Sequence, residues 1–263
     1  MSRDETTEFV RQLEEAVNAR LEKARLDKEL SMAAEVQQSL LSRAVHSTPY
    51  SETAGDSIPC RAIGGDFFEL VHLPSGDFGI ALGDVSGKGP ASAILAAMIQ
   101  GMLAVEVQTE HSPSAILARL NRLLAGRGLG PRFATLFYGV LSSDGRFVYS
   151  NAGHNPPMIL SRNGLLRLTV GGPILGAFSQ SKFDEARIYL SKGDTMIMFS
   201  DGVTEACDAE GREFGEDRLL SSVTASGTAP EILRGILGRV EDFCQGTAQT
   251  DDITLAVTRF RGL

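Results

Sequence analysis

The spacing of apolar residues predicts that the chain opens with a long helix. Residues 4–41 contain no Gly or Pro and are rich in Glu, Arg, Lys, Ala and Leu, a composition that favours helix. Apolar side chains recur there in an imperfect heptad pattern, at Val10, Leu13, Val17, Leu21, Ala24, Leu30, Ala33, Ala34, Leu40 and Leu41. Such a helix would be roughly 57 Å long at about 1.5 Å per residue, and it cannot bury this stripe on its own. We therefore expect a coiled-coil homodimer through this helix, with a helix laid across its own domain as the alternative.

After this helix the pattern changes to short apolar runs. Residues 47–59, with two prolines, a glycine and several Ser and Thr residues, predict a linker. Strands are expected at 67–73, 78–82, 133–141, 147–150, 158–160, 186–190, 195–200 and 253–260, and helices at 90–107, 113–125, 216–222 and 230–243. Short turns between strands imply antiparallel pairing. The order predicts an α+β sandwich of two antiparallel sheets flanked by helices, in a domain of residues 46–263 that follows a helical segment of residues 1–45.

Charge and cysteine content narrow the possible classes of function. A net charge of −8 at pH 7 argues against a nucleic-acid partner, because nucleic-acid-binding proteins carry basic surfaces. The three cysteines, Cys60, Cys207 and Cys244, form no CxxC pair and favour a reducing compartment. Residues 1–25 lack the apolar core of a signal peptide, and the longest uncharged run, 89–105, is shorter than the about 20 residues of a membrane span. We expect a cytoplasmic protein with no membrane span.

The segment Gly83-Asp84-Val85-Ser86-Gly87-Lys88-Gly89 is the first candidate for chemistry. An apolar run precedes it and Pro90 follows, so it reads as a strand end, a turn and a helix start. Its glycines allow the backbone to approach a ligand closely. It is not a nucleotide-binding P-loop, because three residues rather than four separate Gly83 from Gly87. The segment predicts an ion or phosphate site, and a turn with a solvated Asp84 is the alternative.

Carboxylates in similar settings strengthen the first interpretation. They lie at strand ends or in Gly-rich turns, at Asp66, Asp84, Asp201, and Asp251 with Asp252. One alone is ordinary turn chemistry, but together, in a chain with only four histidines, they favour the hard cations Mg²⁺ or Mn²⁺. Two such ions sharing one Asp, roughly 3.5–4 Å apart, would offset the repulsion and activate a water against a phosphoryl group. His154, in the turn 151–156, is either near this site or a hydrogen-bonded turn residue.

In this order the motifs resemble those of the metal-dependent PPM/PP2C-type serine/threonine phosphatases, in particular the bacterial SpoIIE/RsbU-like branch. The resemblance runs from about residue 33 to 260, through the segments 34–41, 64–68, 83–89, 151–156, 200–205 and 250–254. It implies an α-β-β-α sandwich with two ions, Mn²⁺ or Mg²⁺, at one end. Asp84 would bridge both ions, the carbonyl of Val85 would bind one, and Asp201 and Asp251 would hold the other. Asp66 would act directly or through a water.

Two positions depart from the wider family. Ser86 stands where eukaryotic members have a His proposed as general acid, and His154 stands where many members have an Asp for a third metal. The usual phosphate-binding Arg is not evident. The resemblance therefore leaves the proton donor to the leaving group unassigned.

The resemblance implies a protein phosphatase acting on phosphoserine or phosphothreonine, with Asp66, Asp84, Asp201 and Asp251 as catalytic, metal-binding residues. Its implied substrate is a phosphorylated STAS-domain anti-sigma-factor antagonist in a partner-switching pathway. A catalytically weak metal-binding scaffold that sequesters a partner is the alternative function, and a hydrolase of non-protein phosphoesters is a third. Residues 33–41 resemble the segment that joins an upstream regulatory element to the catalytic domain. We hypothesise that this helical region moves the helix at 90–107 and so sets metal occupancy.

Overall fold

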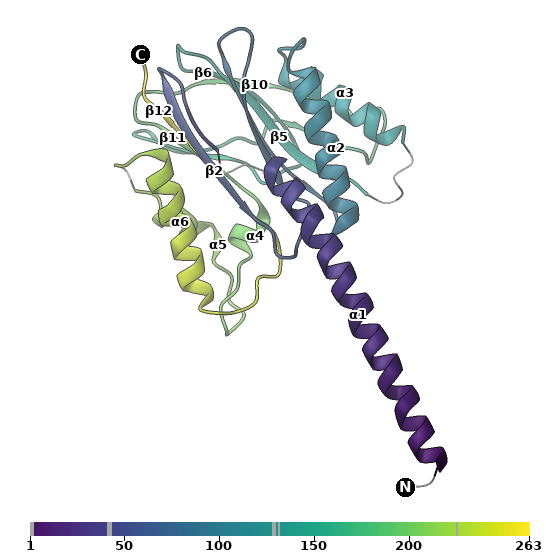
Figure 1. Cartoon of the computed structure of the whole chain (residues 1–263). Coiled ribbons are helices and arrows are strands. Elements are labelled where there is room, and N and C mark those ends of the chain that lie inside the picture. The colour runs from purple at the N-terminus through teal and green to yellow at the C-terminus, as the bar shows by residue number, and fades with distance from the viewer. Residues whose placement is uncertain (1–2, 41–43, 128–129, 131, 225) are drawn as a thin grey trace. The chain divides into compact units, whose positions relative to one another are not determined.

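The computed structural model divides the chain into two compact units, residues 1–40 and 41–263. The structure describes residues 3–40, 44–127, 130, 132–224 and 226–263. The first unit is one unbroken helix, α1 (Arg3–Leu40), as its composition predicts (Figure 1). Apolar side chains along it are exposed to solvent, among them Leu13, Val17, Leu21, Leu26 and Val36. Self-association through α1 stays a prediction. No helix in the described part of the chain is long and apolar enough to cross a membrane.

The second unit contains two six-stranded sheets among its described residues. The first sheet has the strand order β1 (Ala44–Ser47), β2 (Ser51–Ile58), β12 (Ile253–Phe260), β11 (Thr195–Phe199), β7 (Met158–Ser161), β8 (Gly164–Arg167). The second has the order β10 (Ala186–Tyr189), β6 (Arg146–Ala152), β5 (Ala134–Leu141), β4 (Phe78–Val85), β3 (Phe67–His72), with β9 (Gly171–Gly172) added beside β6. The pairs along both orders are antiparallel, and β9 pairs with β6 in parallel.

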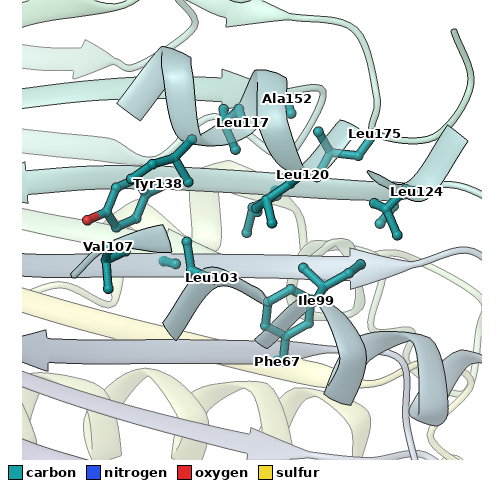
Figure 2. Packing of buried hydrophobic residues seen from close by; sticks show 14 of the residues in the cluster. Phe67, Ile99, Leu103, Val107, Leu117, Leu120, Leu124, Tyr138, Ala152 and Leu175 are labelled. Atoms are coloured by element: carbon teal, nitrogen blue, oxygen red, sulfur yellow. The ribbon is translucent and has the colours of Figure 1, made fainter. Parts of the chain in front are cut away.

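Side chains alternate across the strands and so create three apolar layers. In β4, Ile80 and Leu82 point into the space between the sheets, where Met198 of β11 also lies. Ala81 and Val85 lie in the cluster formed with the helices α2 (Pro90–Glu106) and α3 (Pro113–Ala125), which Figure 2 shows in part. The third layer joins the first sheet to α4 (Asp201–Thr204), α5 (Gly215–Ser221) and α6 (Ala229–Cys244). The α-β-β-α sandwich predicted from the sequence is confirmed (Figure 1).

The linker predicted at 47–59 is wrong, because most of this segment is sheet. Strand β2 pairs with β12 along its whole length, from Ile58 opposite Ile253 to Ser51 opposite Phe260. Its Ser and Thr hydroxyls find partners across the strand pair: Thr53 lies 3.0 Å from Thr258, and Ser57 lies 2.7 Å from Thr254. Such cross-strand hydroxyl pairs stabilise a sheet, so the polar composition that indicated a loop belongs to a buried strand. Strands β8 and β9 and the short helix α4 are also absent from the sequence-based prediction.

Candidate metal centre

Both sheets deliver carboxylates to the same end of the sandwich. In the second sheet, Asp84 lies near the end of β4, and Asp66 immediately precedes β3, where Phe67 pairs with Gly83. In the first sheet, Asp201 follows β11, and Asp251 lies two residues before β12. These elements bring together the four positions expected from the sequence. Their role as a ligand set stays a prediction.

Electrostatic interactions connect the carboxylates of the second sheet, Asp66 and Asp84, with those of the first sheet. Burial, followed by the charges of Asp201 and Asp251 from the other sheet, raises the pKa of Asp84 to about 6. Burial and the charge of Asp84 raise the pKa of Asp66 well above its ordinary value. Burial and Asp251 also raise the pKa of Asp201. The cluster therefore holds more negative charge than its surroundings stabilise, and it favours uptake of a proton or a cation.

The glycines of the motifs allow these segments to approach each other. A Cβ on Gly65 would lie 2.7 Å from the carbonyl oxygen of Val85 and 3.4 Å from Asp84 Oδ1. A Cβ on Gly202 would collide with the carbonyl oxygen of Asp252. Glycine is needed at both positions because any side chain would collide with the neighbouring backbone. Backbone conformation is not the reason, since neither residue has a positive φ. The Val85 carbonyl thus lies beside the Asp84 carboxylate, as a shared ligand position requires.

Asp252 has a different task from its neighbour Asp251. Its Oδ1 accepts a hydrogen bond from the backbone N–H of Cys60 at 2.8 Å, and its Oδ2 accepts one from Gly65 at 2.7 Å. The buried Asp252 side chain therefore anchors the loop that carries Asp66. The carboxylate pattern alone did not separate the two aspartates, whereas the family resemblance assigned only Asp251 as a ligand; alternation at the start of a strand places adjacent side chains on opposite faces.

A second group of potential ligands lies nearby. Cys60, Asp251 and Asp252 place one ligand atom each within 4.8 Å of one another. Both oxygens of Asp252 already accept backbone hydrogen bonds. Burial and Asp252 raise the pKa of the Cys60 thiol, which disfavours the thiolate that binds metals. The four carboxylates are the better candidate.

Lys88 contacts the carboxylate cluster, and the sequence analysis did not identify it as a site residue. Its Nζ lies 2.8 Å from Asp251 Oδ2 and donates a hydrogen bond to the carbonyl of Thr250. It thereby connects the turn after β4 to the segment before β12. The one signal for Lys88 in the sequence is its place between Gly87 and Gly89.

His154 contacts the strand next to Asp84. Its side chain is buried, and its Nδ1 lies 2.8 Å from the hydroxyl of Thr135, the residue opposite Asp84 in the β4–β5 pair. Burial lowers the pKa of His154 to about 4, so the imidazole is neutral at pH 7. Ser86 is similarly engaged: its Oγ accepts a hydrogen bond from the N–H of Phe133 at 3.0 Å. Both residues hold the turn that presents Asp84.

The donors present fit a hard divalent cation. They are carboxylate oxygens and one backbone carbonyl, with no nitrogen or thiolate required. Asp66 Oδ2 is buried and has no hydrogen-bond partner, which leaves an oxygen lone pair available inside the cluster. Mg²⁺ and Mn²⁺ both match this chemistry.

Comparisons with known proteins agree with this architecture. The family model described as Stage II sporulation protein E (SpoIIE) matches residues 74–261. Phosphoserine phosphatase RsbU of Bacillus subtilis is 31% identical over 238 residues, which cover 88% of this chain and 70% of that protein. The structure of the SiaA-PP2C domain of Pseudomonas aeruginosa has a TM-score of 0.76 at 16% identity and covers 90% of this chain and 98% of that one. RsbX in complex with magnesium has a TM-score of 0.63 at 18% identity, over 82% and 98% of the two chains.

At these identities the two solved structures support the fold alone. The family model, however, spans most of the chain, and the similarity to RsbU extends over more than two thirds of both proteins. Asp84, Asp201 and Asp251 lie within the range that the family model matches, whereas Asp66 lies before it. The chain belongs to the SpoIIE family and is a PP2C-type protein serine/threonine phosphatase.

Proposed function

We propose that this phosphatase hydrolyses phosphoserine and phosphothreonine on a protein substrate by a two-metal mechanism at Asp66, Asp84, Asp201 and Asp251. The observation that carries the proposal is the mutual destabilisation of these carboxylates, which raises the pKa of Asp84 to about 6. A cluster that repels its own charges in this way lowers its free energy by binding cations. The similarity to phosphoserine phosphatase RsbU supports a phosphoserine substrate.

Each carboxylate has a distinct place in this proposal. Asp84 would contact both ions, because it lies between Asp66 of its own sheet and the two aspartates of the other. The Val85 carbonyl would complete one ion site, and Asp201 with Asp251 would hold the other. Two ions bound there would supply Lewis-acid activation of water and would offset the charge of the phosphoryl oxygens. The magnesium complex of RsbX supports Mg²⁺ as one suitable ion.

The chain's own residues control the proton at this site. Burial and neighbouring carboxylates raise the pKa of both Asp66 and Asp84, so without a cation this pair favours holding a proton. That proton must leave before both carboxylates can act as ligands. Lys88 holds Asp251 and the Thr250 carbonyl together, and this contact orients the Asp251 carboxylate. His154 stays neutral and supports Thr135 behind Asp84.

The proposed substrate is a phosphorylated STAS-domain anti-sigma-factor antagonist, and the proposed setting is a partner-switching pathway in the cytoplasm. The family and the RsbU similarity support the substrate. Free cysteines at Cys60, Cys207 and Cys244 agree with a reducing compartment. Exposed apolar residues along α1 support a homodimer through that helix, and an upstream regulatory partner would act through the same segment.

Phosphate release tests the proposal. The purified protein is assayed with p-nitrophenyl phosphate, and then with a phosphorylated STAS-domain protein, with and without Mn²⁺. We expect turnover of both substrates that depends on Mn²⁺ or Mg²⁺. Tight binding of the phosphoprotein without release of phosphate at any Mn²⁺ concentration would instead support the scaffold alternative.

A further inference from the structure

A cleft of about 610 Å³ lies along α6 and borders the candidate metal centre. Its lining includes Asp251, a member of the carboxylate cluster, and Gly202, which follows Asp201 in the chain. Its walls are α6, the end of β2 and the segment 246–251. A volume of this size lies within the range of about 300–1,000 Å³ in which proteins bind ligands.

The lining of the cleft combines apolar and charged side chains. Ile58 is 39% exposed there, and Leu237 and Ile253 are half-buried. Apart from the metal ligand Asp251, the charged lining residues are Asp56, Glu241 and Arg234, so carboxylates outnumber the guanidinium. This balance disfavours an anionic small molecule. It suits a polypeptide with an apolar side chain and a nearby basic one.

The segment 246–251 links the cleft to the metal centre. The side-chain amide of Gln249 donates hydrogen bonds to the carbonyl of Ile58 at 2.7 Å and to that of Asp251 at 2.6 Å. One side chain therefore fixes the end of β2 and the backbone of a proposed metal ligand together. A segment of substrate lying in the cleft would be held in a constant position relative to the cluster.

We infer that this cleft binds the stretch of substrate polypeptide next to the phosphorylated serine or threonine. The inference rests on the proposed phosphatase function. A phosphoryl group at the carboxylate cluster leaves its polypeptide at the rim of the sandwich, and the cleft continues from that point at Asp251 and Gly202. The chain lacks an evident phosphate-binding Arg, so contacts remote from the phosphate supply the binding that positions it.

Two glycines of α6 give a matched pair of test variants. Gly238 lines the cleft, and a Cβ added to it would meet no atom within 4 Å. Gly235 lies three residues earlier in the same helix, has equally open surroundings and does not line the cleft. Gly238→Phe would fill the cleft, whereas Gly235→Phe would add the same ring outside it. Neither glycine has a positive φ, so both variants should fold.

Three measurements on the full chain decide the question. Thermal melts establish folding, p-nitrophenyl phosphate turnover reports the metal chemistry, and a decapeptide with phosphoserine between leucine and lysine reports docking. We expect Gly238→Phe to raise KM for the peptide about tenfold while kcat/KM for p-nitrophenyl phosphate stays within about twofold of wild type. Gly235→Phe should leave both substrates unchanged. Unchanged peptide kinetics in Gly238→Phe, or an equal loss with both substrates in a folded variant, would overturn the inference.

Binding of the same peptide, labelled and followed by fluorescence polarisation, separates this inference from the function on which it rests. If the wild type turns over neither substrate with Mn²⁺, the phosphatase proposal fails. The cleft assignment then stands if Gly238→Phe weakens peptide binding and Gly235→Phe does not. It falls if the two variants bind the peptide equally well.

Discussion

Replacing Asp84 by Asn should abolish turnover and stabilise the metal-free protein at the same time. The charged form of Asp84 is disfavoured in the fold, since burial and the neighbouring Asp201 and Asp251 raise its pKa from 3.8 to about 6. At about 1.36 kcal/mol for each tenfold change in proton affinity, this corresponds to a cost of ~3 kcal/mol above pH 6. Asn removes the charge and the cost, and it also removes the oxygen that both ions would share.

The expected gain is visible in a thermal melt. A change of 1 kcal/mol in the free energy of unfolding shifts Tm by ~2–4 °C in a domain of this size. A gain of ~3 kcal/mol therefore sets an upper bound of about 6–12 °C on the rise in Tm. Proton uptake at Asp66, whose pKa is also raised, relieves part of this cost, and we expect a rise in Tm of about 5 °C in chelator at pH 7.5. Melts of Asp84→Asn and wild type, with p-nitrophenyl phosphate turnover in Mn²⁺, provide the two readouts.

The pH dependence fixes the sign of this effect. A raised folded-state pKa means that the contribution of Asp84 to stability is fully present below about pH 4 and is lost as the pH rises through about 6. The Tm difference between Asp84→Asn and wild type should therefore be near zero at pH 4 and reach its maximum above pH 6. Asp184→Asn, which removes an exposed carboxylate, is the control and should show no such trend. A lower Tm in Asp84→Asn, or turnover equal to wild type, would refute the reasoning.

Four further predictions concern Asp201, Asp252 and the N-terminal helix. Asp201→Asn should also lose turnover and raise the metal-free Tm, because burial and Asp251 raise the pKa of Asp201 in the same direction; a destabilised variant in melts would contradict this. Asp252→Ala should lower the free energy of unfolding by roughly 2–3 kcal/mol in urea titrations, since its carboxylate anchors the Asp66 loop through backbone N–H groups; Asp252→Asn should lose less. Deleting residues 1–28 should convert a dimer into a monomer in light scattering, and an unchanged mass would place the interface on the globular unit. The same deletion should change the Mn²⁺ concentration that gives half-maximal turnover if the N-terminal helix sets metal occupancy, and equal values with and without the helix would exclude that switch.

The parts of the fold that the sequence predicts well are those with local signals. Strand β4, the turn after it and α2 follow from one apolar run, a cluster of glycines and Pro90. Strand β2 carries no such signal, because the hydroxyls of Thr53 and Ser57 find their partners in β12, about 200 residues away. A polar strand of this kind cannot be distinguished from a loop until its partner is known. The same limit applies to α4, a single helical turn.

In the candidate site, too, some residues are identified by the sequence next to them, whereas others act through contacts with segments far away in the chain. Asp66, Asp84, Asp201 and Asp251 were predictable because each follows or precedes an apolar run at a sheet end. The anchoring by Asp252 and the ion pair of Lys88 with Asp251 depend on contacts between segments far apart in the chain. Neither residue type nor spacing reports such contacts.

The distribution of the cluster over two sheets has a mechanical consequence. Asp84 and the Val85 carbonyl move with the second sheet, whereas Asp201 and Asp251 move with the first. Helix α2 begins at Pro90, close after the Asp84 turn, and its Leu95 and Ile99 lie in the same cluster as Val85 of β4. A displacement of α2 would thus shift one half of the ligand set against the other. Because the Lys88 contacts to Thr250 and Asp251 cross from the α2 side to the first sheet, they oppose such a shift and set its energetic cost.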